Sequence, residues 1–341
     1  MAILEPILKS ADCITKYDKP ILTKDDLPYD SALVFNAGVI KHGGKYLMIF
    51  RNDYGTDQEG YERGERLTGT SIGFAESDNG IDGWRVFPEP LCDSHEFEGT
   101  EISRYYDPRI IEIEGKLYLC LAKDTKHGVC GSIAELSDDL KSFRVISSSV
   151  PDNRNMVLFP EKIGGYFVRL ERPMPVYGRG RDRFDIWMSR SPDLEFWGKS
   201  ELILGVEDIP YANDKIGPAA PPIKTKDGWL IIYHAVDIDR ERGKNGWEQK
   251  WQKRYCAGVM LLDLLEPSKV LGVSKIPLIA PDTPIETDQG FRENAVFPCA
   301  AILEDDGEVK IYYGASDTVV CLATANIDDL IALCKENCED K

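Results

Sequence analysis

Short runs of alternating apolar and polar residues recur along the whole chain, each led by a glycine turn. Tyr, Ile, Leu and Val dominate these runs, which begin at Gly44, Gly115, Gly165, Gly228 and Gly307. A period of two is typical of β-strands that bury one face. Another apolar stretch ending in a polar turn precedes most of these glycines, so the two runs together predict a β-hairpin.

A further apolar run follows each hairpin and leads into an acidic or proline-containing turn. About five such units, each of three or four strands, recur at spacings of roughly 50 to 80 residues. One unit alone cannot bury both faces of its sheet and needs neighbours. The pattern therefore predicts an all-β fold, a five-bladed β-propeller forming a single domain over residues 1–341, with residues 1–30 as an N-terminal segment.

The tail of the chain differs from the rest because its apolar residues follow a helical period. Ile327, Leu330, Ile331 and Cys334 fall on one face, which predicts a short C-terminal helix over residues 326–337. The alternative fold is a pair of β-sandwiches. No linker rich in Pro, Gly or Ser divides the chain, which favours the propeller.

Charge and composition narrow the possible partners and the compartment. The 341 residues include 41 basic and 58 acidic side chains, a formal net charge of −17, which would repel nucleic acid and anionic membranes. No stretch resembles a membrane span or a signal peptide. The nine cysteines include no CxxC pair, which indicates buried free thiols in a reducing compartment and hence a cytoplasmic protein. The four histidines show no i, i+4 pair, so no metal site is expected.

Polar residues recur at equivalent places in the repeats, and in a propeller such positions converge on the axial funnel. The segments concerned begin at Phe35, Tyr106, Arg154, Lys215 and Asn294. Asp107 precedes a proline, which keeps it out of helical backbone, and its carboxylate is expected to face the axis. A carboxylate that bonds only its own turn is the alternative.

Four basic residues lie near strand ends that should border the same funnel. Because the protein is acidic overall, their gathering predicts an anion site, with separate surface ion pairs as the alternative. These residues are Arg154, Arg172, Lys215 and His234. In the tract 243–251, Trp247 and Trp251 are expected to stack on a sugar or to pack on the next blade. The basic segment 177–183 is expected to be a solvated hairpin tip.

Several motifs give the chain a resemblance to a known family. They are YYDPRI at residues 105–110, NRNMVLFPEKIGGYFVRLERP at 153–173, KIGPAAPPIKTKDGWLIIYHAV at 215–236 and VFPCAAILEDDGEVKIYYGASDT at 296–318. In this order they resemble glycoside hydrolase family 130, the β-mannoside phosphorylases and mannosidases, from about residue 30 to the C-terminus.

The resemblance implies a role for each matching residue. Asp107 matches the single catalytic acid of the family. The phosphate ligands of its phosphorylases match Arg154, Arg172, Lys215, His234 and Tyr255. The residues that would hold the mannose beside the scissile bond match Asn36, Arg51 and Asp317. Tyr106 is also expected to bind the substrate, and Trp247 or Trp251 is expected to stack on the acceptor, because aromatic faces bind the apolar faces of sugar rings.

The implied reaction is an inverting phosphorolysis of a β-mannoside that yields α-mannose 1-phosphate. An inverting hydrolase needs a second carboxylate to activate water, whereas phosphate is already an anionic nucleophile that cations can hold. Inorganic phosphate would be the co-substrate, and neither a cofactor nor a metal is expected. Asp107 would donate its proton through a sugar hydroxyl, which requires burial or like charge to raise its pKa.

Two other functions remain open at this stage, a β-mannosidase of the same family and a non-catalytic glycan-binding propeller. The resemblance favours a β-1,4-linked mannooligosaccharide or a mannosyl-hexose as substrate. The tract 237–254 is longer than that branch suggests, and Cys256 follows Tyr255 where another residue is usual. Linkage, acceptor sugar and a homo-oligomeric state are therefore left open.

Overall fold

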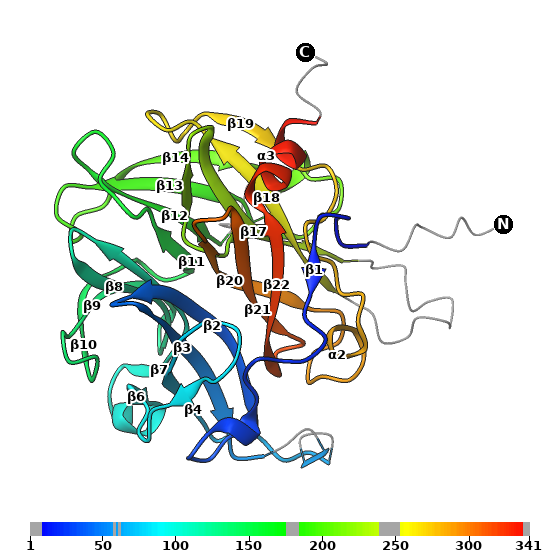
Figure 1. The fold of residues 1–341 in the computed structure, drawn as a ribbon. Helices are drawn as coiled ribbons and strands as arrows, with labels where there is room; N and C mark the ends of the chain where they lie inside the picture. The colour runs from blue at the N-terminus through cyan, green and yellow to red at the C-terminus, as the bar shows by residue number, and fades with distance from the viewer. Residues whose placement is uncertain (1–8, 57–58, 61–62, 175–183, 239–252, 337–341) are drawn as a thin grey trace.

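The structure, a computed structural model, describes residues 9–56, 59–60, 63–174, 184–238 and 253–336, and its strands form five antiparallel sheets. The sheets are arranged as blades around a central axis (Figure 1). The prediction of an all-β, five-bladed propeller is confirmed, and the alternative of two β-sandwiches is wrong.

Each blade begins with the strand nearest the axis and continues outward. Blade one contains β2 (Leu33–His42), β3 (Lys45–Tyr54), β4 (Gly69–Ser77), β5 (Arg85–Val86) and β6 (Cys92–Asp93). Blade two contains β7 (Ile102–Ile113), β8 (Lys116–Thr125), β9 (Gly128–Leu136) and β10 (Phe143–Ser148). Blade three contains β11 (Asn153–Leu158), β12 (Phe167–Pro173), β13 (Ile186–Ser191) and β14 (Gly198–Leu204). Blade four contains β15 (Lys215–Pro218), β16 (Ile223–Thr225), β17 (Gly228–Asp237), β18 (Arg254–Leu262) and β19 (Val270–Val273). Blade five contains β20 (Val296–Leu303), β21 (Glu308–Ala315) and β22 (Val319–Asn326).

The glycine-led runs of the sequence are the second strands of the five blades, namely β3, β8, β12, β17 and β21. The apolar runs that follow them are the third strands. Short 3-10 turns, η1 (Lys24–Asp26), η2 (Ser94–Phe97) and η3 (Val206–Asp208), lie in the connections. The period-two pattern therefore identified the repeating part of every blade.

The N-terminal segment closes the ring, a role that the sequence did not reveal. Strand β1 (Thr15–Lys16) pairs with β22, where Thr15 lies opposite Thr324 and Lys16 opposite Ala323. Further along, the N–H of Ile21 donates to the carbonyl of Val320 at 2.8 Å. Blade five is thus built from both ends of the chain, and its outer strand comes from residues that precede blade one.

The C-terminal helix α3 runs over Ile327–Lys335, close to the predicted range 326–337, of which residue 337 lies outside the described residues. The side chain of Asn326 caps the helix by accepting the N–H of Asp328 at 2.9 Å. Buried Leu330, Ile331 and Cys334 pack it against the core. Among the helices of the described ranges, none has both the length and the apolar character to cross a membrane.

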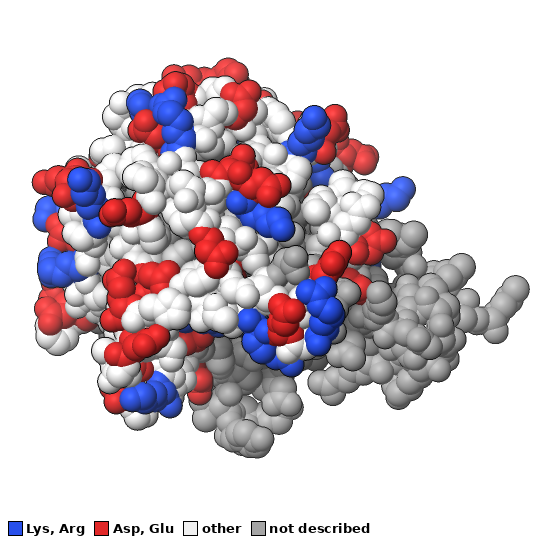
Figure 2. All heavy atoms as spheres, turned by 90° about the horizontal axis from the view of Figure 1, so that it is seen from below, with Lys and Arg blue, Asp and Glu red and all other residues white. Residues whose placement is uncertain are grey.

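The core lies between neighbouring blades, because each sheet buries apolar residues on both faces. Ile49 and Ile72 of blade one pack with Leu119 and Ala134 of blade two, and all four are fully buried. The outer surface is polar. On the face drawn in Figure 2, Asp and Glu are interspersed with Lys and Arg in small groups. On that face the charge is spread out instead of forming one patch.

A buried carboxylate fixes the loop between blades four and five. Glu286 of the short helix α2 (Pro284–Thr287) is fully buried and accepts from Lys16 Nζ at 2.7 Å and from Tyr313 Oη at 2.9 Å. It also accepts the N–H groups of Asp282 and Thr283 at 3.0 and 3.1 Å. This network ties β1 to the loop that leads into β20.

We expect Glu286→Ala to lower the free energy of unfolding by about 3 to 5 kcal/mol, because it leaves several buried donors and a buried lysine without their acceptor. Denaturant unfolding measures the loss. Glu101→Ala is the matched control, since Glu101 is exposed and pairs with Lys126 and His127 only at the surface. Equal losses in the two variants would contradict a role for Glu286 in holding the loop.

Candidate active site

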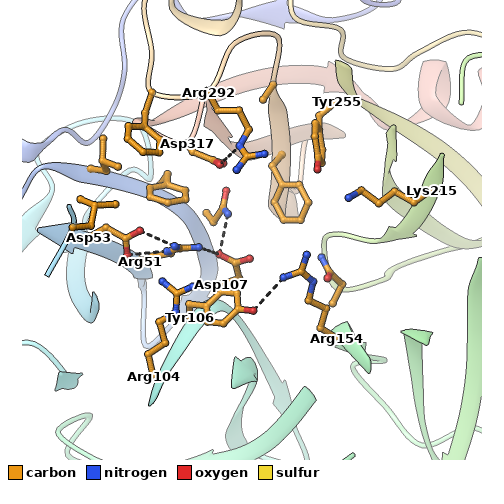
Figure 3. A pocket seen from close by; sticks show the side chains of 18 of the residues that line it. Arg51, Asp53, Arg104, Tyr106, Asp107, Arg154, Lys215, Tyr255, Arg292 and Asp317 are labelled. Carbon is orange, nitrogen blue, oxygen red and sulfur yellow. Dashed lines mark hydrogen bonds and ion pairs between the residues drawn. The ribbon is translucent and has the colours of Figure 1, made fainter. Parts of the chain in front are cut away.

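A pocket of about 290 Å³ opens at the centre of the propeller, lined by residues of all five blades. Figure 3 shows Asp107 near its middle, with Arg51 on one side and Arg154 on the other. The pocket contains most of the residues that the sequence proposed. The members of that set are Asn36, Arg51, Tyr106, Asp107, Arg154, Arg172, Lys215, Tyr255 and Asp317.

Repeated β-bulges direct polar side chains into this pocket. The innermost strands of blades one, two and three each lose register at the same place, after Phe35, Tyr106 and Arg154. The residue that follows has a positive φ in each case, 52° for Asn36, 52° for Asp107 and 60° for Asn155. Asn and Asp tolerate this left-handed backbone better than most residues. The bulge explains why equivalent positions of the repeats converge on the axis.

Close contact between blades one and two holds the bulge at Asp107. A Cβ on Gly38 would lie 2.8 Å from the carbonyl oxygen of Pro108 and 3.0 Å from the Cα of Arg109. Only glycine allows β2 to approach β7 this closely.

One half of the pocket combines carboxylates with hydrogen-bond donors, as a sugar site requires. Asn36 Nδ2 donates to Asp107 Oδ1 at 2.9 Å, and Arg51 Nη1 lies 3.4 Å from the same oxygen. Arg51 also forms a two-pronged ion pair with Asp53, at 2.9 and 2.6 Å. Its guanidinium lies over the rings of Phe35 and Tyr106. Arg51 is therefore fixed, and its charge acts directly on Asp107.

The structure adds Arg292 to this half, a residue that the sequence analysis missed. Its Nε donates to Asp317 Oδ2 at 2.7 Å, and half of its side chain is exposed. Figure 3 shows it between Asp317 and Tyr255. Arg292 lies two positions before Asn294, at the start of a segment that the repeats had already marked. Its place on a loop instead of a strand concealed it.

The other half of the pocket carries positive charge. It is lined by Arg154, Arg172 and Lys215 together with Tyr255 and Asn155, and none of these side chains is a carboxylate. Arg154 Nη1 donates to the hydroxyl of Tyr106 at 3.1 Å, and that hydroxyl donates to Asp124 at 2.9 Å. Three basic side chains that share one wall could hold a compact anion.

His234 lies behind this wall and does not border the pocket. It is fully buried, and its Nε2 lies 2.9 Å from Arg172 Nη1. A guanidinium only donates, so Nε2 must accept and the ring is neutral. Burial, followed by the charges of Arg172 and Lys215, lowers the pKa of His234 well below its usual value. The expectation that His234 adds a fourth cation is wrong, because it orients Arg172 instead.

Gly217 makes the contact between Arg172 and His234 possible. A Cβ at that position would lie 2.4 Å from His234 Cε1 and 3.0 Å from Arg172 Cδ. A side chain at position 217 would therefore push the two apart.

The cations of the pocket are held against their own repulsion. Burial and the neighbouring Arg154 lower the pKa of Arg172 to about 9. Burial, Arg172 and Lys253 lower the pKa of Lys215 to about 7. The charge of an anion bound among these groups would oppose both shifts, so the charge of Lys215 near neutral pH depends on what occupies the site.

The two buried carboxylates of the pocket are shifted in opposite directions. Burial favours the protonated form of Asp107, but Arg51, Arg109 and the Asn36 bond outweigh it and lower its pKa below the usual value. Burial, with the charge of Asp107 adding to it, raises the pKa of Asp317 despite the opposing Arg292 and Arg51. The raised pKa that Asp107 needs as a proton donor is therefore not provided by the protein groups alone.

Two sequence-based expectations lie outside the described residues. Trp247 and Trp251 fall in the range 239–252, and the basic segment 177–183 falls in 175–183. Within the described ranges, no group of three His, Cys, Asp or Glu side chains is arranged to hold a metal ion.

The chain is similar over most of its length to known mannoside phosphorylases. The family model described as beta-1,4-mannooligosaccharide phosphorylase matches residues 5–336. The chain is 32% identical to a 1,2-β-oligomannan phosphorylase of Thermoanaerobacter sp., over 92% of this chain and 97% of that protein. It is 30% identical to a β-1,4-mannooligosaccharide phosphorylase of Ruminococcus albus, over 96% and 94%. The solved β-1,2-mannobiose phosphorylase of Listeria innocua superposes with a TM-score of 0.78 at 24% identity, over 95% of this chain and 99% of that one.

Proposed function

This chain belongs to glycoside hydrolase family 130 and is a glycoside phosphorylase, and we propose that it cleaves β-mannosides with inorganic phosphate to give α-mannose 1-phosphate. The relatives act on β-1,2-linked or β-1,4-linked mannosides according to their names. The proposal therefore specifies the β-mannoside and leaves the linkage and the acceptor to experiment. Inorganic phosphate is the co-substrate, and no cofactor or metal is proposed.

The division of the pocket is the observation that supports phosphorolysis best. The carboxylates that line it, Asp53, Asp107 and Asp317, belong to one half, where Asp53 and Asp107 pair with Arg51 and Asp317 pairs with Arg292. The other half presents only cations, amide and hydroxyl groups among its described residues. A water molecule there would lack a carboxylate base, whereas a phosphate would be held by charge.

In the proposed mechanism, the sugar next to the scissile bond binds against Asn36, Arg51, Tyr106 and Asp317. Phosphate binds to Arg154, Arg172, Lys215 and Tyr255, with His234 supporting Arg172. A phosphate oxygen attacks the anomeric carbon, the bond to the leaving oxygen breaks, and the configuration inverts. Asp107 supplies the proton that the leaving oxygen gains, through a hydroxyl of the sugar, and ends the step as a carboxylate. Positioning of the nucleophile and electrostatic stabilisation account for the rate.

Phosphate itself would provide the conditions under which Asp107 holds a proton. The charges of Arg51, Arg109 and Arg154 favour its carboxylate form. A bound phosphate brings negative charge next to Arg154, which opposes this effect and favours the protonated acid. Proton loading of Asp107 would then follow phosphate binding, so the acid is ready only when the nucleophile is present.

Cytoplasmic localisation remains part of the proposal. The eight cysteines within the described ranges are free, and seven of them are buried, which suits a reducing compartment. A homo-oligomer is left open.

A panel of β-mannosides tests the proposed function. We expect β-1,2-mannobiose, β-1,4-mannobiose or mannosylglucose to yield mannose 1-phosphate only when phosphate is present, and the linkage that reacts fastest identifies the substrate. Mannose release at full rate in phosphate-free buffer would instead support the β-mannosidase alternative. Binding of these sugars without any turnover would support the non-catalytic alternative.

A further inference from the structure

Arg109 is a buried cation that binds neither the sugar nor the phosphate in the proposed mechanism. It follows Asp107 by two residues on β7 and is 2% exposed. Its Nη1 donates to the backbone carbonyl of Asp107 at 2.6 Å, and its Nε donates to the carbonyl of Ala219 at 3.0 Å. One guanidinium therefore connects the bulge of blade two to the backbone that follows β15 in blade four.

The charge of Arg109 has no direct counter-ion within the described part of the chain. Its two acceptors are neutral carbonyls, and no carboxylate oxygen of a described residue lies within ion-pair distance. Its Nη2 is buried without a hydrogen-bond partner among these residues. A buried unpaired charge is costly. The acidic chain nevertheless keeps one beside its most important carboxylate.

The surroundings of Arg109 connect both halves of the pocket. The guanidinium lies 5.3 Å from the ring centre of Phe297, and the same ring packs against His234 at 4.8 Å. Arg109 also contributes to the lowered pKa values of Asp107 and His234. Its charge therefore acts both on Asp107, the general acid, and on His234, which orients Arg172.

We propose that Arg109 is a positioning residue of the phosphorolytic site, which anchors the Asp107 bulge to blade four and keeps a positive charge without a direct ion pair between the general acid and the phosphate-binding wall. The hydrogen bond to the Asp107 carbonyl stabilises the left-handed backbone that aims the carboxylate at the sugar. The charge holds Asp107 as a carboxylate until phosphate arrives, and it attracts the phosphate. This inference deepens the proposed function and rests on it.

Several other groups act on Asp107, so the contribution of Arg109 must be separated from theirs. The charged and titratable side chains that face Asp107 are Arg51 on β3, Tyr106 and Arg109 on β7, Arg154 on β11, Cys299 on β20 and Asp317 after β21. Of these cations, Arg109 alone is bonded to the Asp107 backbone. Changes at Arg109 can therefore separate charge from anchoring.

Two substitutions divide these roles. Arg109→Gln removes the charge and keeps one donor, whereas Arg109→Lys keeps the charge and loses the two-carbonyl bridge. The pH dependence of kcat is measured for both at saturating phosphate and mannoside, together with the KM for phosphate. Arg85→Gln is the control, because Arg85 is an exposed surface arginine of blade one, paired with Glu76 and Asp78.

We expect Arg109→Gln to move the descending limb of the kcat profile to higher pH by about one unit, since the loss of a nearby cation raises the pKa of a carboxyl group. Its KM for phosphate should rise about tenfold, as expected for the loss of about 1.4 kcal/mol of binding. Arg109→Lys should lower kcat about tenfold without moving the limb, because the charge remains.

The outcomes distinguish this inference from the proposed function. If the unmodified protein forms no mannose 1-phosphate, the proposed function fails. If the unmodified protein is active and Arg109→Gln keeps the pH profile and phosphate KM of Arg85→Gln, the role of Arg109 is refuted. If Arg109→Gln fails to fold, Arg109→Lys still decides the matter, since an unchanged kcat would overturn the anchoring role and a shifted limb would overturn the role of the charge.

Discussion

Replacing Asp107 by asparagine is expected to lower turnover by about 10² to 10⁴-fold, the usual contribution of a general acid. The amide keeps the shape of the side chain and can still accept from Asn36 Nδ2, which now donates to Asp107 Oδ1 at 2.9 Å. It cannot supply the proton that the leaving oxygen needs. Release of mannose 1-phosphate, measured at saturating phosphate and mannoside, gives the loss directly.

The fold should survive this substitution for two reasons. Asp107 has φ of 52°, a left-handed conformation that asparagine tolerates equally well. Arg51 keeps its two-pronged ion pair with Asp53 when the charge of Asp107 is removed. The melting temperature and its increase with phosphate should therefore remain close to those of the unmodified protein.

Asp139→Asn is the control for Asp107→Asn, because Asp139 lies in a surface turn and bonds only its own loop. It should retain full activity. If Asp107→Asn keeps more than about a tenth of the original rate, general acid catalysis by Asp107 is excluded, since even the lower bound of the expected effect is larger.

The sequence predicted the repeating fold because its evidence is local. Each second and third strand of a blade carries its own period-two pattern, and a turn residue marks its start. Strand β1 carries no such evidence, since it is only two residues long and pairs with residues more than 300 positions away. The closure of blade five by Thr15 and Lys16 therefore became visible only in the structure.

The sequence identified most residues of the site but not their protonation states. The repeats placed Asp107 and Arg154 in segments at equivalent places of their blades, and the structure brings both into one pocket. Protonation depends on neighbours from other blades, which no local pattern reveals. His234 is neutral because Arg172 donates to it. Burial raises the pKa of Asp107, but Arg51 and Arg109 outweigh this effect and lower it.

The position of Arg292 could not be predicted from the sequence, because it depends on contacts between distant parts of the chain. Its place in the pocket depends on a loop held by the buried Glu286, which in turn binds Lys16 of the N-terminal segment. Three parts of the chain must meet before Arg292 faces Asp317. The local patterns that predict strands and turns carry no information about contacts among such distant segments.

The substitution Arg172→Ala tests phosphate binding itself and is expected to abolish phosphate-dependent stabilisation. Arg172 is 2% exposed and lies in a wall with Arg154 and Lys215, and burial together with repulsion from Arg154 lowers its pKa to about 9. Phosphate neutralises this repulsion in the folded state only. At a phosphate concentration of 100 times the dissociation constant, a ligand selective for the folded state adds about 2.7 kcal/mol of stability, which a thermal melt detects as several degrees.

Loss of Arg172 should also remove about 2 kcal/mol or more of transition-state stabilisation, because it deletes charge-assisted hydrogen bonds to the attacking anion. The value of kcat/KM for phosphorolysis would then fall at least about 30-fold. Slow hydrolysis is expected to persist, since water can enter the space that the guanidinium vacates. Arg144→Ala is the control, because Arg144 is largely exposed and pairs with Glu135 on the surface. Should Arg172→Ala retain the phosphate-dependent rise in melting temperature seen for Arg144→Ala, the cationic wall is not the phosphate site, and the nucleophile must bind elsewhere in the pocket.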